Sequence, residues 1–424
     1  MNYTKALDYI HSLSKFGSKP GLDRVSRLVS LAGNAQKNLK FIHIAGTSGK
    51  GSVASYCASI LKQAGYKVGL YTSPYVTDFR ERFQINGEVI GKEEFSTLVQ
   101  ALIPYVEEIN RGGEVITEFE FNTALGFLWF KRQKCDVVVL EVGMGGRFDA
   151  TNVIEIPLFS VITSIGLDHT DYLGDTIDKI AFEKCGIIKS GCPIVSYPLQ
   201  KSEALRVIGE VCEQRGSRLY LPSLASLTDT HLSLGYSKFC FEGEEYRVNM
   251  AGEHQIYNAI TAITAIKCLK DCGFDADCDS IKKGIEAVCC PARLEVISEK
   301  PLVIIDGAHN ADKVKALYDY VKQFSGRIVS VCGMLKDKDY SLAAELIAPL
   351  CKRIVTVTPQ NPRALSAKEL SAVFAPYCKD CTPADSVSDG ARLAYNSLAD
   401  GDILLCWGSL YIAGEVRETI LSLV

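Results

Sequence analysis

The chain has 424 residues, with 46 Lys and Arg against 50 Asp and Glu, so its formal net charge is −4. Apolar residues make up 47% and charged residues 23%, which is typical of a globular protein and excludes a disordered tail, a collagen-like fibre and a small disulfide scaffold. The balanced charge argues against a surface built for nucleic acid or membranes. The length predicts two or three domains.

The first residues lead into an amphipathic segment rather than the apolar core of a signal peptide. The most apolar late stretch, 403–414, is about half as long as a membrane-spanning helix of roughly 20 residues. We therefore expect a soluble, cytoplasmic protein in which the sixteen cysteines are mostly reduced thiols packed as small apolar side chains.

Two motifs imitate metal sites. The pair Cys378 and Cys381 has C-x-x-C spacing, but no second pair lies near it in the sequence. The acidic segment 275–279, with Glu286 further on, imitates a calcium-binding loop, but Ser280 stands where that loop requires glycine. We interpret the first motif as core thiols and the second as a turn whose Asp279 or Ser280 caps a helix.

Short apolar runs alternate with helical periodicities along the first part of the chain. The predicted strands are 41–45, 67–71, 137–140, 158–165 and 194–197. One predicted helix starts at Gly51. Others cover 121–131, 254–272 and a shorter segment that starts at about residue 280. Alternating strands and helices, with β-branched runs such as 137–140, predict a doubly wound, mainly parallel sheet.

A second series of strands begins late in the chain. Its apolar runs are 302–305, 327–331, 353–357 and 402–406. We place a domain boundary near residue 296. The predicted architecture is α/β, with a large domain over 1–296 and a smaller Rossmann-like α/β domain over 297–424.

The strongest single motif is the loop Gly46-Thr47-Ser48-Gly49-Lys50-Gly51-Ser52, between a predicted strand and a predicted helix. Glycines let the backbone curl so that its N–H groups point at phosphate oxygens, and the helix N-terminus adds partial positive charge. Lys50 is placed to reach the β- and γ-phosphates, and Ser52 to lie near a metal ion. Although the spacing departs from the strict P-loop pattern, the context predicts nucleotide binding.

Three polar side chains follow three predicted strands. Ser73 comes after 68–71, Glu141 directly after 137–140, and Asp168 and His169 after 158–165. Ligands of open α/β sheets bind beyond the carboxyl ends of the strands, so these side chains are predicted to face the phosphate loop. Mg²⁺ prefers oxygen ligands, which suits Glu141 and leaves His169 ambiguous on spacing alone.

Taken in order, these motifs resemble the folylpolyglutamate synthase/dihydrofolate synthase family of the Mur ligase superfamily. The resemblance covers nearly the whole chain, in the blocks 21–25, 41–52, 72–74, 118–124, 141–152, 168–170, 180–186, 252–259, 291–295, 306–310 and 407–411. Ser48, Tyr75, Ala292 and Ala311 depart from residues common in the family, which leaves the reaction type intact but the substrate detail open.

The resemblance implies ATP-dependent amide-bond formation with two Mg²⁺ ions. A carboxylate of a folate or of dihydropteroate would attack the γ-phosphate of ATP, and L-glutamate would then attack the acyl phosphate. The implied partners are small-molecule substrates only, with no nucleic acid and no membrane, for a monomeric enzyme. Whether the acceptor is dihydropteroate, a reduced folate or both stays open.

The resemblance also assigns residues. Lys50 and the rest of the loop 46–52 would bind ATP together with Asn258, Arg293 and Asp306, although Asp306 could instead cap its own loop. Ser73, Glu141 and His169 would hold Mg²⁺. Lys184 would be the carbamylated catalytic lysine, although the sequence alone reads it as a solvated helix lysine. His309 and Ser409 would line the glutamate side, and His309 is a catalytic candidate.

The pterin side of the implied pocket comprises Leu22, Asp23, Phe119, Asp149, Ala150 and Thr151. Phe119 could stack on a flat ring, or belong to the core instead.

Two other functions are weighed. A cell-wall Mur ligase would need a UDP-binding domain ahead of the phosphate loop, and 45 residues before Gly46 are too few for one. A nucleotide-hydrolysing switch would not need a second domain bearing Asp306 and His309.

Overall fold

In the computed structural model, residues 1–13 and 21–423 are described. The first lobe is built on an eight-stranded sheet in the order β4-β3-β2-β5-β1-β6-β7-β8. Its strands are β1 (Phe41–Ala45), β2 (Val68–Tyr71), β3 (Phe83–Ile85), β4 (Glu88–Val89), β5 (Val137–Glu141), β6 (Phe159–Ile162), β7 (Ile194–Ser196) and β8 (Leu219–Tyr220). The strands from β2 to β8 in this order are parallel, whereas β3 and β4 form an antiparallel edge. The predicted mainly parallel sheet is confirmed.

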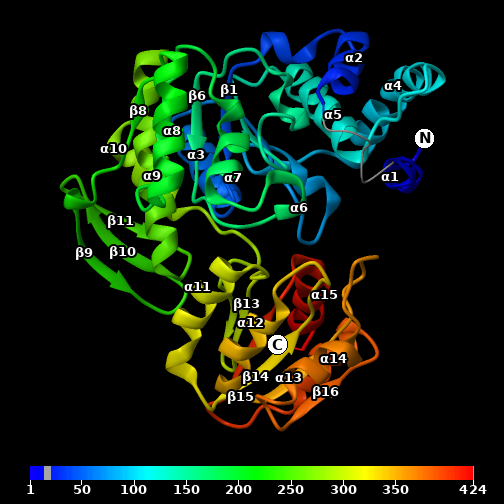
Figure 1. The fold of residues 1–424 in the computed structure, drawn as a ribbon, viewed down its shortest axis with the longest axis vertical. Helices are drawn as coiled ribbons and strands as arrows, with labels where there is room; N and C mark the ends of the chain where they lie inside the picture. The colour runs from blue at the N-terminus through cyan, green and yellow to red at the C-terminus, as the bar shows by residue number, and fades with distance from the viewer. Residues whose placement is uncertain (14–20, 424) are drawn as a thin grey trace.

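Helices cover both faces of this sheet (Figure 1). They are α1 (Tyr3–Ser12), α2 (Asp23–Leu31), α3 (Lys50–Gln63), α4 (Lys92–Arg111), α5 (Glu118–Arg132), α6 (Thr170–Leu173), α7 (Ile177–Lys184), α8 (Ser202–Arg215), α9 (Glu253–Cys268) and α10 (Cys278–Glu286). Ile42 and Ile44 of β1 pack in the core with α3, α9 and α10, whereas Phe41 packs in the core with α2, α4 and α5. Burial on both faces explains why these strands are continuously apolar.

A small antiparallel sheet lies between the two lobes, at the left of Figure 1. It consists of β9 (Leu227–Leu232), β10 (Ser237–Phe241) and β11 (Glu244–Val248). Phe239 and Tyr246 stack with ring centroids 5.4 Å apart and join the core that contains α3 and α9. The sequence does not predict this sheet, because its strands carry many exposed polar residues and lack a continuous apolar run.

The second lobe is a six-stranded sheet in the order β12-β13-β17-β14-β15-β16. Its strands are β12 (Glu295–Glu299), β13 (Leu302–Ile305), β14 (Ile328–Cys332), β15 (Cys351–Thr356), β16 (Cys381–Pro383) and β17 (Ile403–Trp407). Its helices are α11 (Ala311–Val321), α12 (Tyr340–Ile347), α13 (Ala367–Phe374), α14 (Val387–Asn396) and α15 (Leu410–Leu421). Only β12 is antiparallel to its neighbour, and it straddles the predicted boundary at residue 296.

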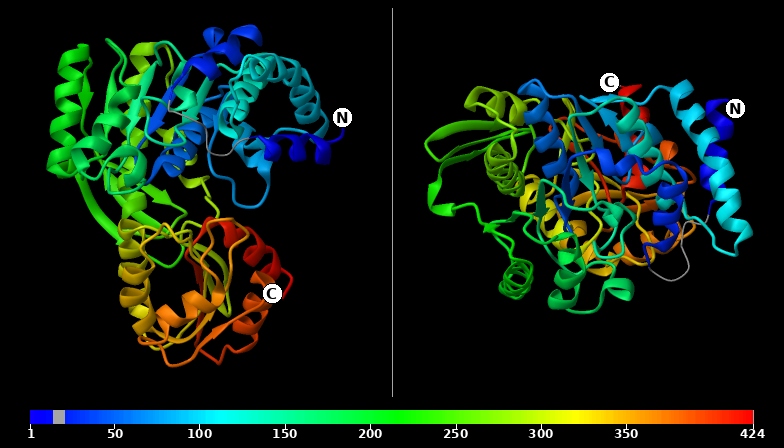
Figure 2. Two further views of the ribbon diagram at one scale, coloured as in Figure 1. Left: turned by 45° about the vertical axis from the view of Figure 1, so that its right-hand side comes forward. Right: turned by 90° about the horizontal axis from the view of Figure 1, so that it is seen from above.

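The two lobes meet along one side of each sheet (Figure 2). Asp168, after β6, accepts hydrogen bonds from Asn310 Nδ2 at 2.9 Å and from Lys338 Nζ at 2.9 Å, both from the second lobe. On α15, Gly414 packs directly against the backbone of Val76. The ends of β1, β5 and β6 therefore face the second lobe across a shared interface.

The two motifs that imitate metal sites have structural roles. Asp277, rather than Asp279 or Ser280, caps α10 by accepting a hydrogen bond from Ser280 N at 2.8 Å. Cys378 is buried, and its thiol donates to the Cys351 carbonyl at 3.5 Å. Among the described residues, no helix has the length and apolarity needed to cross a bilayer.

The close packing of α10 on α3, which carries the phosphate loop at its start, gives a stability prediction. A Cβ at Gly284 would collide with the backbone of Ile60, so Gly284→Ala should force the two helices apart. We expect the free energy of unfolding to fall by about 1–3 kcal/mol and the thermal midpoint to fall by several degrees. Gly209→Ala on α8 is the matched control, because nothing lies within 4 Å of the added Cβ. Circular dichroism melts of both variants measure the difference, and equal midpoints would contradict this packing.

Candidate active site between the lobes

The phosphate loop is shaped by its neighbours in space. Gly49 has φ +90°, and a Cβ there would lie 2.5 Å from Asn258 Oδ1, so only glycine fits. Thr47 Oγ1 donates to the Gly166 carbonyl at 3.0 Å and is 3.1 Å from Gly166 N, which fixes the loop to the segment after β6. Ser48 Oγ is buried without a hydrogen-bond partner among the described residues. The predicted loop 46–52 and Asn258 therefore lie together.

Two lysines converge on one carbonyl of this loop. Lys50 Nζ donates to the Gly46 carbonyl at 3.0 Å, and Lys184 Nζ donates to the same oxygen at 2.8 Å. Lys184 is only 4% exposed, so the sequence-only interpretation of a solvated helix lysine is wrong. Burial, and next the charge of Lys50, lower the pKa of Lys184 to about 7. A large fraction of this amine is therefore neutral near neutral pH.

The predicted metal ligands lie at strand ends, as expected. Glu141 ends β5, is 4% exposed, and accepts a hydrogen bond from Ser73 N at 3.0 Å. Burial raises the pKa of Glu141, while the nearby Lys50 acts in the opposite direction. His169 has φ +52° just before α6, and burial lowers its pKa to about 4 despite the adjacent Asp168. The imidazole is thus neutral and available as a ligand.

This donor set fits Mg²⁺ that arrives with a nucleotide. The described residues contain no group of three or more His, Cys, Asp or Glu side chains arranged to hold a metal ion. Glu141 and Ser73 offer oxygen donors, and His169 offers a nitrogen donor. Three donors alone do not fill the octahedral coordination of Mg²⁺. Mg²⁺ usually keeps waters and completes its octahedron with phosphate oxygens, so an incomplete protein set beside a phosphate loop suits it.

The second lobe contributes its residues through two loops. Asp306 directly follows β13, and its two carboxylate oxygens accept backbone hydrogen bonds from Leu294 N at 2.8 Å and Ala308 N at 2.7 Å. The hydrogen bond from Leu294 N holds the linker that carries Arg293. The hydrogen bond from Ala308 N shows that Asp306 also caps its own loop. His309 Nδ1 lies 2.7 Å from the Gly307 carbonyl. A carbonyl only accepts, so Nδ1 carries the proton and Nε2 presents a lone pair.

The predicted pterin-side residues surround the loop after β5. Asp149 accepts from Met144 N at 2.9 Å and from Thr151 Oγ1 at 2.6 Å, so it shapes the loop through both oxygens. Phe119 covers Gly143, where a Cβ would lie 2.5 Å from the ring. Leu22, Phe119 and Ala150 belong to or pack against one apolar cluster, and Asp23 begins α2 beside them.

Ser409 is less clearly part of the site. Its side chain is 3% exposed and accepts a hydrogen bond from Tyr411 N at 3.2 Å, so it caps α15. Within the described part of the chain, no hydrogen bond joins Ser409 to His309.

The sequence does not predict a role for two lysines of the second lobe, Lys313 and Lys338. Lys313 Nζ lies 3.4 Å from His309 Nε2, and Lys338 forms the bridge to Asp168 with only 9% of its side chain exposed. The only available signal was position, since Lys313 lies one helical turn after His309. Lysines at helix starts and in loops are usually solvated, so nothing in the sequence marked them.

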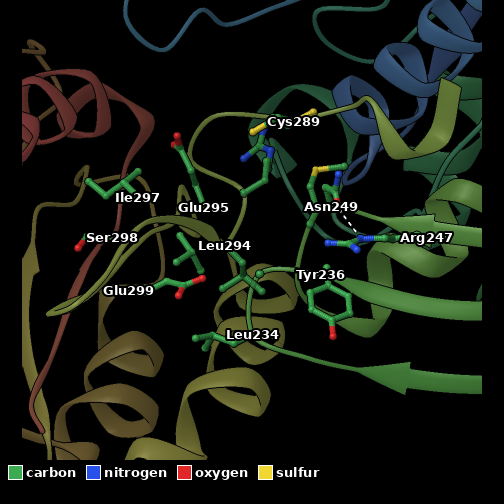
Figure 3. A pocket seen from close by; sticks show the side chains of 15 residues that line it. Leu234, Tyr236, Arg247, Asn249, Cys289, Leu294, Glu295, Ile297, Ser298 and Glu299 are labelled. Atoms are coloured by element: carbon green, nitrogen blue, oxygen red, sulfur yellow. Dashed lines mark hydrogen bonds between the residues drawn. The ribbon is translucent and has the colours of Figure 1, made fainter. Parts of the chain in front are cut away.

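A cavity of about 500 Å³ lies behind this cleft, between the linker to β12 and the small antiparallel sheet (Figure 3). Arg247, which donates to Asn249 Oδ1 at 2.9 Å, and Tyr236 line one wall. Of the residues predicted for the site, only Arg293 lines this cavity. The candidate site is therefore the region where the phosphate loop meets the second lobe and not this cavity.

Comparisons with known proteins agree with this arrangement. Residues 44–266 match the Mur ligase middle domain, and residues 292–410 match the Mur ligase glutamate ligase domain. The chain is 37% identical to the dihydrofolate synthase/folylpolyglutamate synthase of Bacillus subtilis over 99% of each chain. It is 36% identical to the folylpolyglutamate synthase of Lacticaseibacillus casei over 100% of this chain and 99% of that protein.

Solved structures are similar as well. Mycobacterium tuberculosis folylpolyglutamate synthase complexed with ADP and AMPPCP has a TM-score of 0.89 at 30% identity, over 98% of each chain. E. coli FolC in complex with DHPP and ADP has a TM-score of 0.84 at 29% identity, over 100% of this chain and 98% of that one. The chain therefore belongs to the Mur ligase family and, within it, to the folylpolyglutamate synthase/dihydrofolate synthase family of ATP-dependent ligases.

Proposed function

We propose that this protein joins L-glutamate to a folate, to dihydropteroate or to both, at the expense of ATP. The observation that carries the proposal is the lobe interface at which Lys50 and Lys184 share the Gly46 carbonyl, with Arg293 on the linker and His309 at the start of the second lobe. Such a cleft places a phosphate, an acceptor carboxylate and an amine between two lobes. Ligands named for relatives, namely ADP, AMPPCP and DHPP, support these substrate classes.

The first step is phosphoryl transfer. A carboxylate oxygen of the acceptor attacks the γ-phosphorus of ATP, an O–P bond forms, and ADP leaves with the electrons of the broken bond. The backbone N–H groups of the phosphate loop, Lys50 and Arg293 neutralise the charge that spreads over the phosphoryl oxygens. Ser73, Glu141 and His169 would hold Mg²⁺, which supplies further neutralisation of the phosphates when it is bound.

The second step forms the amide. The amine nitrogen of glutamate attacks the acyl carbon, phosphate leaves, and the attacking nitrogen loses its protons to bases of the site. His309 is placed for this side of the cleft because its Nε2 carries a free electron pair. The donation from Nδ1–H to the Gly307 carbonyl at 2.7 Å holds the ring in this orientation.

We propose that Lys184 is carbamylated. The ammonium first loses a proton. The neutral amine then attacks the carbon of CO₂, a C–N bond forms as one C–O π bond becomes the carboxylate electron pair, and a second proton is released, so a cation becomes an anion. A pKa lowered to about 7 supports this, because the reactive neutral amine is abundant above that pH. An anion beside the phosphate loop would bind a second Mg²⁺.

The same proposal includes the domain organisation, the oligomeric state and the cellular compartment. The chain would work as two domains, 1–296 and 297–424, in a monomer. All sixteen cysteines lie among the described residues and are free thiols, which supports a reducing compartment such as the cytoplasm.

Removing the phosphate-loop lysine tests the reaction. Lys50→Ala should lower glutamate-dependent release of phosphate by at least about a thousandfold, because a charge that acts on the transferring phosphoryl group is lost. Lys62→Ala, at the exposed far end of the same helix, should keep wild-type turnover. Thermal melts of both variants confirm folding, and ligation by a folded Lys50→Ala enzyme at the wild-type rate would refute the assignment.

The Lys184 modification is tested by ¹³C NMR with labelled bicarbonate. A carbamate resonance should grow as the pH rises from about 6 to 8, because the amine loses its proton through a pKa of about 7. Lys184→Met should lack this resonance, while Lys189→Met, five residues further along, should keep it. Absence of a resonance in the wild type with ATP and Mg²⁺ present would count against the carbamate.

The acceptor is found by direct assay. Dihydropteroate and tetrahydrofolate are each incubated with ATP and L-glutamate, and products are sized by mass spectrometry. A gain of one glutamate on dihydropteroate identifies dihydrofolate synthase activity, and serial gains on tetrahydrofolate identify polyglutamylation. Phosphate release that needs neither acceptor nor glutamate would instead indicate a nucleotide-hydrolysing switch.

A further inference from the structure

Lys313 is a cation at the lobe interface whose charge has no partner. It is the third residue of α11, and its backbone N–H donates to the Asn310 side chain at 3.1 Å. Its Nζ lies 3.4 Å from the neutral His309 Nε2. Across the described residues, no carboxylate comes within ion-pair distance of Lys313. A partly buried ammonium normally has an anionic partner, so its partner is expected from outside the chain.

The start of α11 is docked on the phosphate-binding lobe. Asn310 donates to Asp168 at 2.9 Å, and Gly166 has no Cβ at the point where Asp312 packs against it. Gly166 is in turn held by Thr47 of the phosphate loop through both of its backbone polar groups. This short series of contacts places Lys313 at the phosphate side of the cleft.

The charges around Lys313 point to a phosphate. Burial, and next the charges of Arg293 and Lys50, lower the pKa of Lys313 to about 7. Arg293 also lies beside Gly307, whose carbonyl holds His309. Three cations repel one another unless an anion lies between them. The acids whose charges interact with Lys313 already have partners: Asp168 is bound by Lys338 and Asn310, Asp306 accepts from Leu294 N and Ala308 N, and Glu141 accepts from Ser73 N.

We propose that Lys313 binds the terminal phosphate of the nucleotide and stays on that phosphoryl group while it passes to the acceptor carboxylate. This role rests on the proposed function, because it assumes that Lys50 and Arg293 contact the same triphosphate. Lysine acts here as a point charge on phosphate oxygens. The contact comes from the second lobe, so it forms only when the two lobes enclose the γ-phosphate.

Nucleotide binding to the full-length protein tests this role. Calorimetry with Mg²⁺ compares AMPPCP, which keeps a terminal phosphonate, with ADP, which has none. Lys313→Met should weaken AMPPCP binding about tenfold or more, since one charge-assisted contact is lost, and should change ADP binding less than about twofold. Lys315→Met is the matched control on the exposed side of α11 and should bind both nucleotides as the wild type does.

The outcomes separate the possibilities. An equal loss for ADP and AMPPCP, or no loss for either, would overturn the assignment to the terminal phosphate. A raised KM for glutamate with unchanged AMPPCP binding would also overturn it, by assigning Lys313 to the amino-acid carboxylate. Lys313→Arg, which keeps the charge, should restore most AMPPCP affinity and shows that the Met variant is not merely misfolded. A wild-type protein that binds no nucleotide would refute the proposed function itself.

Discussion

Positive charge held close together and partly out of water is the constraint around which the cleft is organised. Lys50 and Lys184 share one carbonyl, and the charges of Arg293, on the linker, and Lys313, on the second lobe, act on each other nearby. Burial and mutual repulsion lower the pKa of both Lys184 and Lys313 to about 7. A polyphosphate bound among these cations would offset their mutual repulsion, so this arrangement of positive charge suits such a ligand.

The second lobe completes the site through a small number of directional contacts. Asp168 lies immediately before His169, so the hydrogen bonds from Asn310 and Lys338 fix the lobe interface next to a proposed metal ligand. Glycine at position 166 permits the close approach of α11. Motion of the second lobe would therefore change the surroundings of the phosphate loop directly.

Much of the fold, and part of the candidate site, could be predicted from local sequence. The strands β1, β5 and β6 are largely apolar because helices cover both faces of the sheet. A charged residue is therefore conspicuous there, and Glu141 is such a residue at the end of β5. The burial of Lys184 could not be predicted, since its position depends on how α7 packs against the phosphate loop. Lys313 was missed for a similar reason: its neighbours come from segments that are distant in sequence.

The charge of Lys184 bears on whether the proposed second Mg²⁺ could be held. As a protonated amine, Lys184 adds to the repulsion that Lys50 experiences at Gly46. As the proposed carbamate it would instead attract Lys50 and a cation, and it would add a second acidic group to Glu141 beside the phosphate loop. Because the unmodified amine has a pKa of about 7, the change of sign depends on available CO₂ and on pH. A lysine exposed to water, with an ordinary pKa, would stay protonated and could not make that change near neutral pH.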